Sequence, residues 1–348
     1  MKLLLVSTKT EHSKGGIAVW TDSFLEKCAE YGMDCDLLNI ATIGKRAKQG
    51  NARRNFKDEF LRTRAIFKNL RFMLKKQSYD VVHVNTSCGT FGLIRDYLTI
   101  LKIKKKQPSC KRIIHFHCDI QQQCGSKIGQ HFLLKILKAT NQALVLNQRN
   151  CNYLYQTFGV SSAVVANFIA STMVRVDIKV IEPEVKDALF VGYVRPEKGI
   201  RELYDLAQKF PQTNFRLIGE IHREVMTWDK PDNVILCGKK NRSEILSEMD
   251  KADVFIFLSH SEGFSIALLE SMARGLPCLA TDVGANAEML ENKGGIVVAR
   301  QDSLAAIAAF ERLQSPKTRE EMSIWSLEKV RSSYTLEKVM EQIVGFYK

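Results

Sequence analysis

The sequence predicts an α/β protein of two doubly wound domains, each a parallel β-sheet with helices on both faces. One observation behind this prediction is that short apolar runs alternate with longer helical patterns, as they do in parallel sheets. Another is that the alternation stops near residue 169 and restarts after residue 184. The third is the length of 348 residues, which is too long for one core and suits two domains.

Short apolar runs mark the expected strands. In the first half these are residues 3–7, 35–39, 81–84, 112–117 and 143–146, with a helix over 17–31. In the second half they are 188–191, 214–218, 233–236, 254–258, 277–280 and 295–298. We expect a linker at 169–184, between a first domain of residues 1–168 and a second domain of residues 169–330. Two such domains in tandem imply a cleft between them, where ligands usually bind.

The composition is that of a folded protein without a membrane-spanning helix. Hydrophobic residues make up 45% of the chain and charged residues 26%. No run of about 18 uncharged apolar residues occurs, and the apolar run at the N-terminus is too short for a signal peptide. The nine cysteines are irregularly spaced and form no C-x-x-C motif, which indicates reduced thiols in a reducing compartment. We therefore expect a cytoplasmic protein.

The net charge of +13 is compatible with an anionic substrate, an anionic membrane surface or nucleic acid as partner. The charge is concentrated in residues 41–76, where twelve lysines and arginines stand against Asp58 and Glu59, with aromatic and aliphatic residues between them. Two interpretations remain open for this segment. It is either a basic amphipathic helix on an anionic membrane or a surface helix whose apolar stripe packs on the first domain.

The most informative segment is 253–277, in which an apolar strand leads through a loop into a helix that starts near Phe264 and ends near Gly275. The unpaired amides of a helix start can hold a phosphate. Glu262 and Glu270 are eight residues apart, which is roughly 12 Å along a helix, and this suits the two ends of a sugar nucleotide. The alternative is a loop glutamate and a surface helix glutamate, but the neighbours of Glu270 are mostly apolar.

Glu262-x7-Glu270, followed by Arg-Gly-Leu-Pro and Ala-Thr-Asp-Val-Gly, resembles the signature of family 4 of the retaining GT-B glycosyltransferases. The resemblance implies two tandem Rossmann-like domains, with the donor held mainly by the second and the acceptor by the first. It places Glu262 beside the donor sugar, the Gly263 and Phe264 amides at the diphosphate, and Glu270 at the ribose. Ser265 departs from the family's pattern, because it replaces a common glycine.

Residues 189–199 resemble the family's G-R-L-x-x-x-K-G element, which implies that Gly192 ends a strand and Lys198 meets the diphosphate. Tyr193 stands where the family has an arginine. Either Arg195 compensates for it, or stabilisation of the leaving group is weaker. The competing interpretations are a solvated helix-start lysine for Lys198 and an ordinary surface residue for Arg195.

In the first domain, Gly15 and Gly16 resemble the family's Gly-Gly loop near the donor phosphate, although a plain helix-entry turn is the alternative. The resemblance also implies that a histidine after the strand at 112–117 contacts the transferred sugar. His117 fits that position better than His115. The alternatives are a zinc site, which would add Cys118 and Cys124 to these two histidines, and a structural histidine pair. Residues 331–348 resemble the closing helix that crosses back onto the first domain.

These resemblances together imply a hexosyltransferase-type enzyme that moves a sugar with retention from a nucleotide-diphosphate sugar to an acceptor hydroxyl. Neither a metal nor a cofactor is expected. We expect a sugar or lipid-linked glycan as acceptor, a place in cell-surface polysaccharide or glycolipid biosynthesis, and a peripheral contact of 41–76 with the inner face of the cell membrane. No nucleic acid is expected. The alternatives are an epimerase or hydrolase acting on a sugar nucleotide, and a basic protein that binds nucleic acid or membrane.

Overall fold

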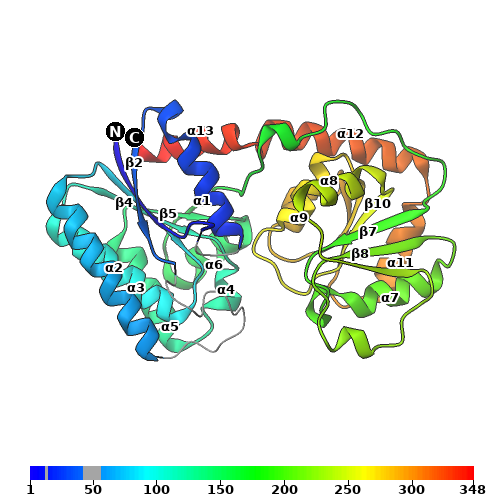
Figure 1. Cartoon of the computed structure of the whole chain (residues 1–348), viewed down its shortest axis with the longest axis horizontal. Helices are drawn as coiled ribbons and strands as arrows, with labels where there is room; N and C mark the ends of the chain where they lie inside the picture. The colour runs from blue at the N-terminus through cyan, green and yellow to red at the C-terminus, as the bar shows by residue number, and fades with distance from the viewer. Residues whose placement is uncertain (12–14, 42–55) are drawn as a thin grey trace. The chain divides into compact units, whose positions relative to one another are not determined.

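The computed structural model describes residues 1–11, 15–41 and 56–348, and these divide into two compact units. The first unit contains residues 1–167 and 339–348, and the second contains residues 168–338 (Figure 1). The chain passes between them at 167–168 and again inside α13 (Leu336–Tyr347). Each unit is a six-stranded parallel sheet with flanking helices, so the predicted fold class is confirmed.

The sheet of the first unit has the strand order β2-β1-β3-β4-β5-β6, and every neighbouring pair is parallel. The strands are β1 (Lys2–Ser7), β2 (Asp34–Asn39), β3 (Val81–Thr86), β4 (Lys111–Phe116), β5 (Gln142–Val145) and β6 (Ala163–Val164). Its helices are α1 (Gly16–Lys27), α2 (Phe56–Lys76), α3 (Thr90–Lys106), α4 (Ile120–Gln123), α5 (Lys127–Ala139) and α6 (Gln148–Phe158).

The two faces of this sheet carry different side chains, because successive residues of a strand point to opposite faces. Val82 and Val84 of β3 join a core that also contains α2, α3 and α5. His83 lies between them in the sequence and packs on the opposite face, against Trp20 of α1 and Tyr347 of α13. The first unit thus has an aliphatic core on one face and an aromatic, histidine-rich core on the other.

The second unit repeats the pattern with the order β12-β11-β10-β7-β8-β9. Its strands are β7 (Asp187–Val191), β8 (Asn214–Ile218), β9 (Val234–Gly238), β10 (Val254–Phe257), β11 (Cys278–Thr281) and β12 (Gly295–Val298). Its helices are α7 (Ile200–Lys209), α8 (Arg242–Lys251), α9 (Ile266–Ala273), α10 (Asn286–Leu290), α11 (Ser303–Arg312) and α12 (Pro316–Ser333). Since β7 and β10 are adjacent and parallel, the loops that follow them leave the sheet at the same edge.

One expectation about the cysteines is wrong, because Cys88 and Cys118 form a disulfide. The reason lies in the strand register. Thr86 at the end of β3 pairs with Phe116 at the end of β4, and each cysteine follows two residues later. The separation of 30 residues in the sequence gives no sign of this proximity. The other seven cysteines are free thiols.

Within the described ranges 1–11, 15–41 and 56–348, no helix combines the length and the apolar character needed to cross a bilayer.

Candidate functional site

The loops after β7 and β10 bring Lys198 and Glu262 together. Lys198 ends the short 3₁₀ turn Pro196–Lys198, and its Nζ donates to a carboxylate oxygen of Glu262 in an ion pair. The two side chains are only 16% and 14% exposed. The backbone joins the same loops, because the amide of His260 donates to the Glu197 carbonyl oxygen at 2.9 Å. A cation and a carboxylate predicted from separate motifs therefore meet at one edge of the sheet.

The helix that follows Glu262 is α9, which begins at Ile266 rather than near Phe264 as predicted. Ser265 is its N-cap residue, but the Ser265 side chain makes no capping hydrogen bond. Ser265 is 3% exposed, and its Oγ has no partner among the described residues. Phe264 is buried, with its ring centroid 6.0 Å from that of Tyr334. A buried hydroxyl without a partner thus stands at a helix start, where backbone amides favour an anion.

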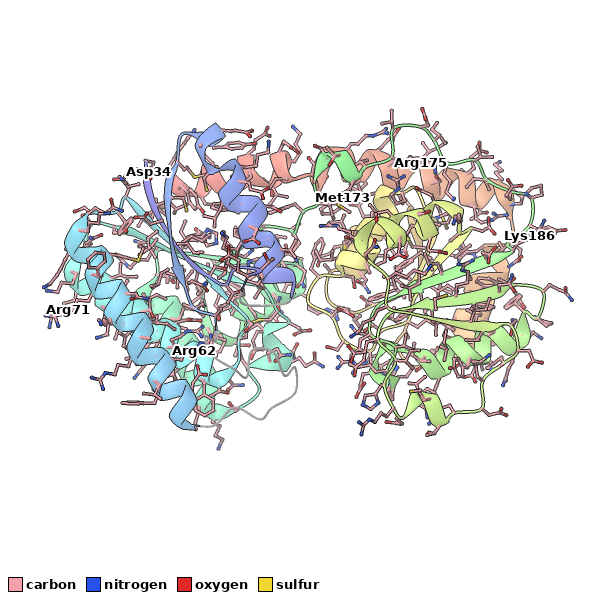
Figure 2. All side chains as sticks on the ribbon, viewed as in Figure 1. Asp34, Arg62, Arg71, Met173, Arg175 and Lys186 are labelled. Atoms are coloured by element: carbon pink, nitrogen blue, oxygen red, sulfur yellow. A yellow bond between two sulfur atoms is a disulfide. The ribbon has the colours of Figure 1, made fainter. Side chains whose placement is uncertain are left out.

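Glu270 lies in the second turn of α9 and is 13% exposed. Its Oε1 is 3.2 Å from Nη2 of Arg242, which begins α8. The same nitrogen lies 2.9 Å from the sulfur of Met173, a residue labelled in Figure 2. Burial raises the pKa of Glu270 above its ordinary value, and the Arg242 charge opposes this shift. Glu270 is therefore a partly desolvated carboxylate with one cationic partner.

Gly284 supports the loop that carries Glu262. Its φ of +55° is in the left-handed region, and a Cβ at this position would overlap the carbonyl oxygens of Glu262 and Gly263. Gly199 is similar: its φ is +72°, and a Cβ there would overlap the Leu258 carbonyl group. Both glycines therefore allow a close backbone approach that no other residue would permit.

We expect Gly284→Ala to move the Glu262–Gly263 loop. The substitution combines left-handed backbone strain with a steric overlap, which together cost on the order of 1–3 kcal/mol. Thermal denaturation should show a lower Tm. Gly345→Ala is the matched control, because a Cβ at Gly345 in α13 meets open space. Equal Tm values for the two variants would contradict this role of Gly284.

Gly192 and Arg195 lie in the loop after β7. Gly192 follows β7 directly, and its amide donates to the Ile218 carbonyl oxygen at 2.9 Å. The Arg195 guanidinium is 5.4 Å from the centroid of the Tyr193 ring, and its Nε is 3.7 Å from Glu197. Arg195 therefore lies against the tyrosine that replaces the family's arginine, with its side chain 43% exposed.

In the first unit, His117 follows β4 and begins a chain of hydrogen bonds. Its Nε2 is 3.1 Å from Asn85 Oδ1, and Asn85 Nδ2 donates to Ser7 Oγ at 3.1 Å. Ser7 Oγ is 2.6 Å from Thr21 Oγ1, which donates to the Ile17 carbonyl oxygen. The chain thus links His117 to the first turn of α1, beside Gly15 and Gly16. Neither Asn85 nor Ser7 was singled out from the sequence.

Three histidines pack together here and are neutral near pH 7. The His115 and His117 ring centroids are 4.1 Å apart, and those of His83 and His115 are 5.4 Å apart. Burial lowers the pKa of His117 to about 3, against the effect of a hydrogen bond to Asn167, and it lowers the pKa of His83 to about 3. Burial also lowers the pKa of His115 well below its ordinary value.

The alternatives left open for this region can now be compared. His115 is fully buried and neither ring nitrogen has a partner among the described residues, which fits a packing role. The zinc alternative loses Cys118 to the disulfide with Cys88, and the described part of the chain contains no cluster of three or more potential metal ligands. Gly15 is the N-cap residue of α1, and a Cβ at Gly15 or Gly16 would meet no atom of the described residues within 4 Å.

Two such sheets, each flanked by helices, are the architecture of the GT-B glycosyltransferases. Sucrose-phosphate synthase from Thermosynechococcus elongatus is 17% identical, with a TM-score of 0.79 over 99% of the chain and 98% of that protein. The crystal structure of Anabaena HepE in complex with UDP-glucose has a TM-score of 0.73 at 15% identity, over 99% of each chain. The fold is therefore GT-B.

Residues 176–324 match the model of the family glycosyl transferases group 1, so this part of the chain is similar to that family. The processive diacylglycerol alpha-glucosyltransferase of Acholeplasma laidlawii is 25% identical over 234 residues, which cover 60% of the chain and 67% of that protein. Two other curated relatives are matched over only 32% and 34% of their own length. The chain thus spans about a third of these two proteins.

Proposed function

We propose that this protein is a retaining, family 4 glycosyltransferase that moves a hexosyl group from a nucleotide-diphosphate sugar to an acceptor hydroxyl. The observation that carries the proposal is the cluster at the start of α9. It contains the Lys198–Glu262 pair and the partnerless hydroxyl of Ser265, and Glu270 lies one turn further along the helix. The group 1 match and the UDP-glucose bound by the HepE fold relative support the donor class.

In the proposed reaction, the leaving nucleoside diphosphate is stabilised by Lys198 and by the amides that lead into α9. Charge stabilisation of this kind, preorganised before the reaction, is a large contribution to catalysis. Lys198 must exchange its bond to Glu262 for one to the diphosphate, which leaves the Glu262 carboxylate for the donor sugar. Glu270 takes the ribose hydroxyls. The acceptor hydroxyl attacks from the face of the leaving group, so no carboxylate nucleophile is required.

His117 contributes a neutral imidazole to the proposed site. Because burial keeps its pKa near 3, the ring neither repels cationic groups nor attracts the diphosphate at neutral pH. It can instead exchange hydrogen bonds with a sugar hydroxyl while Asn85 holds one of its nitrogens. Gly15 and Gly16, at the other end of the hydrogen-bond chain, provide backbone without side chains for the donor phosphate or the acceptor.

The proposal extends to the acceptor and the setting. We infer a sugar or lipid-linked glycan acceptor in cell-surface polysaccharide or glycolipid biosynthesis, without a metal or cofactor. The lipid substrate named for the Acholeplasma relative supports an acceptor of this kind. We place the enzyme in the cytoplasm, in peripheral contact with the inner face of the cell membrane through the basic segment 41–76. Residues 42–55 of that segment lie outside the described part of the chain.

A thermal-shift screen of sugar nucleotides tests the donor class. A donor present at about 100 times its Kd stabilises the folded state by about 2.7 kcal/mol, so the preferred one should raise the Tm by several degrees. Glu270→Ala should abolish most of this shift and raise the donor KM. Glu311→Ala, an exposed glutamate of α11, is the matched control and should retain the shift. If no sugar nucleotide raises the Tm of the unmodified protein, the proposed donor site is wrong.

Product analysis separates transfer from the epimerase or hydrolase alternative. A transferase releases nucleoside diphosphate at a rate that rises when a sugar or lipid-linked acceptor is added, and the sugar appears on the acceptor. An epimerase or hydrolase converts the same donor at an unchanged rate with no acceptor present, and that result would favour the alternative.

A further inference from the structure

The outer side of α2 carries a surface that the proposed donor site does not use. The inner side of this helix is anchored to the first unit, because Ile66 and Leu70 enter its core and Arg62 Nε donates to the Ile40 carbonyl oxygen at 2.9 Å. Arg71 of the same helix is exposed on this outer side (Figure 2). The fold therefore does not require the outer side of α2 to be cationic or apolar.

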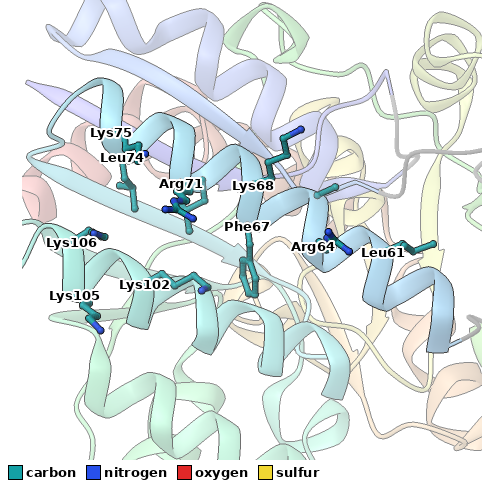
Figure 3. Close-up of a pocket in the computed structure, with 12 residues that line it drawn as sticks. Leu61, Arg64, Phe67, Lys68, Arg71, Leu74, Lys75, Lys102, Lys105 and Lys106 are labelled. Carbon is teal, nitrogen blue, oxygen red and sulfur yellow. The ribbon is translucent and has the colours of Figure 1, made fainter.

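A groove of about 820 Å³ lies where α2 and α3 run side by side (Figure 3). Seven of its twelve lining residues are lysine or arginine, and none of the twelve is acidic. None of the seven forms an ion pair with a residue in the described parts of the chain. Such a group of like charges repels itself in the free protein, and bound anions would relieve the repulsion. The seven come from α2 (Arg64, Lys68, Arg71, Lys75) and from the last turn and a half of α3 (Lys102, Lys105, Lys106).

The other five lining residues are apolar, and large apolar side chains stand exposed around them. Leu61 and Phe72 of α2 are 61% and 68% exposed. At the N-terminal ends of α2 and α3, a second hollow of about 160 Å³ has Phe60 and Phe91 in its lining, with exposed fractions of 61% and 52%. Exposed aromatic and aliphatic groups beside lysines and arginines are the pattern of a surface that lies in a membrane interface.

We propose that the α2–α3 groove and its apolar rim form the surface that docks on an anionic lipid bilayer. Lysines and arginines of the groove bind phosphate headgroups, while Leu61 and Phe72 enter the boundary of the acyl chains. This inference deepens the proposed membrane contact, since it locates the contact and extends it to the end of α3. It does not depend on the proposed transferase activity, because docking requires no donor.

The groove fits headgroups better than nucleic acid. Non-specific nucleic-acid sites stack bases on aromatic rings inside a cationic groove, but here the ring of Phe67 in the groove lining is half-buried, with Lys102 Nζ 4.7 Å from its centroid, and the exposed ring of Phe72 belongs to the rim. The lining also lacks the Asn and Gln side chains that read base edges. A single phosphate would fill a small part of 820 Å³, whereas several adjacent headgroups would fill more of it.

Flotation with vesicles tests this surface on the full chain. Vesicles of phosphatidylcholine mixed with phosphatidylglycerol should bind the protein, and vesicles of phosphatidylcholine alone should not. The triple variant K68E/R71E/K102E should lower the partition coefficient by at least about 100-fold, since each basic residue near an anionic surface contributes about 1 kcal/mol. The control K209E/K293E/K317E makes the same charge change at exposed lysines of the second unit and should still bind.

A second variant, Leu61→Ser with Phe72→Ser, tests the apolar rim and should weaken binding with little change in its salt dependence. Equal binding of both triple variants would overturn the proposal, and so would binding of a nucleic-acid oligomer in preference to anionic vesicles. Donor-induced thermal shifts and vesicle binding, both measured on the unmodified protein, keep the two proposals apart. A normal shift without vesicle binding removes only the docking surface, and vesicle binding without any shift removes only the donor site.

Discussion

Lys198→Ala should lower kcat about 100- to 1000-fold, because it removes a side-chain cation that lies at the start of α9 in contact with Glu262. The substitution also leaves the largely buried Glu262 carboxylate without its partner, and that carboxylate would then repel an incoming diphosphate. Steady-state kinetics with the preferred donor measure the effect. Lys209→Ala, an exposed lysine at the end of α7, is the control and should retain its kcat.

A double-mutant cycle separates the two contributions of Lys198. If the lysine only neutralises Glu262, the Glu262→Ala, Lys198→Ala variant should recover most of the lost activity. If the lysine stabilises the leaving diphosphate, the double variant should stay as slow as Lys198→Ala, or slower. Unchanged turnover in the double variant would show that neither residue belongs to the active site.

The histidine core should make the first unit unstable in mild acid. The ordinary pKa of a histidine in an unfolded chain is about 6.5, whereas burial lowers the pKa values of His83 and His117 to about 3 in the folded state and that of His115 well below 6.5. Below pH 6.5 the unfolded chain therefore binds protons that the folded chain does not bind. Stability is complete above pH 6.5 and is lost as the pH falls toward 3.

The expected loss is large. Three such histidines together cost on the order of 4 kcal/mol at pH 5.5 relative to pH 7.5. Denaturant unfolding of the protein at the two pH values, followed by a probe in the first unit such as Trp20, measures it. His115→Leu should remove about a third of the difference. His131→Leu, at an exposed position of α5, should leave the difference unchanged. If His115→Leu and His131→Leu show the same loss of stability between pH 7.5 and pH 5.5, the buried histidines are not responsible for it.

The local patterns of the sequence were sufficient to predict most strands and helices and to select the residues of the proposed donor site. Apolar periodicity predicted all the described strands except the two-residue β6 to within about two residues, since a buried parallel strand is a short apolar run whatever it pairs with. The Glu262-x7-Glu270 spacing predicted a loop and a helix start, because both residues belong to one continuous segment. The parts of the site that were missed, such as Asn85, Ser7 and Arg242, have no local signature.

By itself, then, the sequence determined two α/β units, a basic chain and a helix start between Glu262 and Glu270. The tertiary structure alone decided which distant residues meet: Lys198 with Glu262, Cys88 with Cys118, and α2 with α3 in one cationic groove. The physical reason is that hydrophobic periodicity acts over a few residues. Contacts between loops depend instead on which strands lie side by side, and that order is set by the packing of the whole sheet.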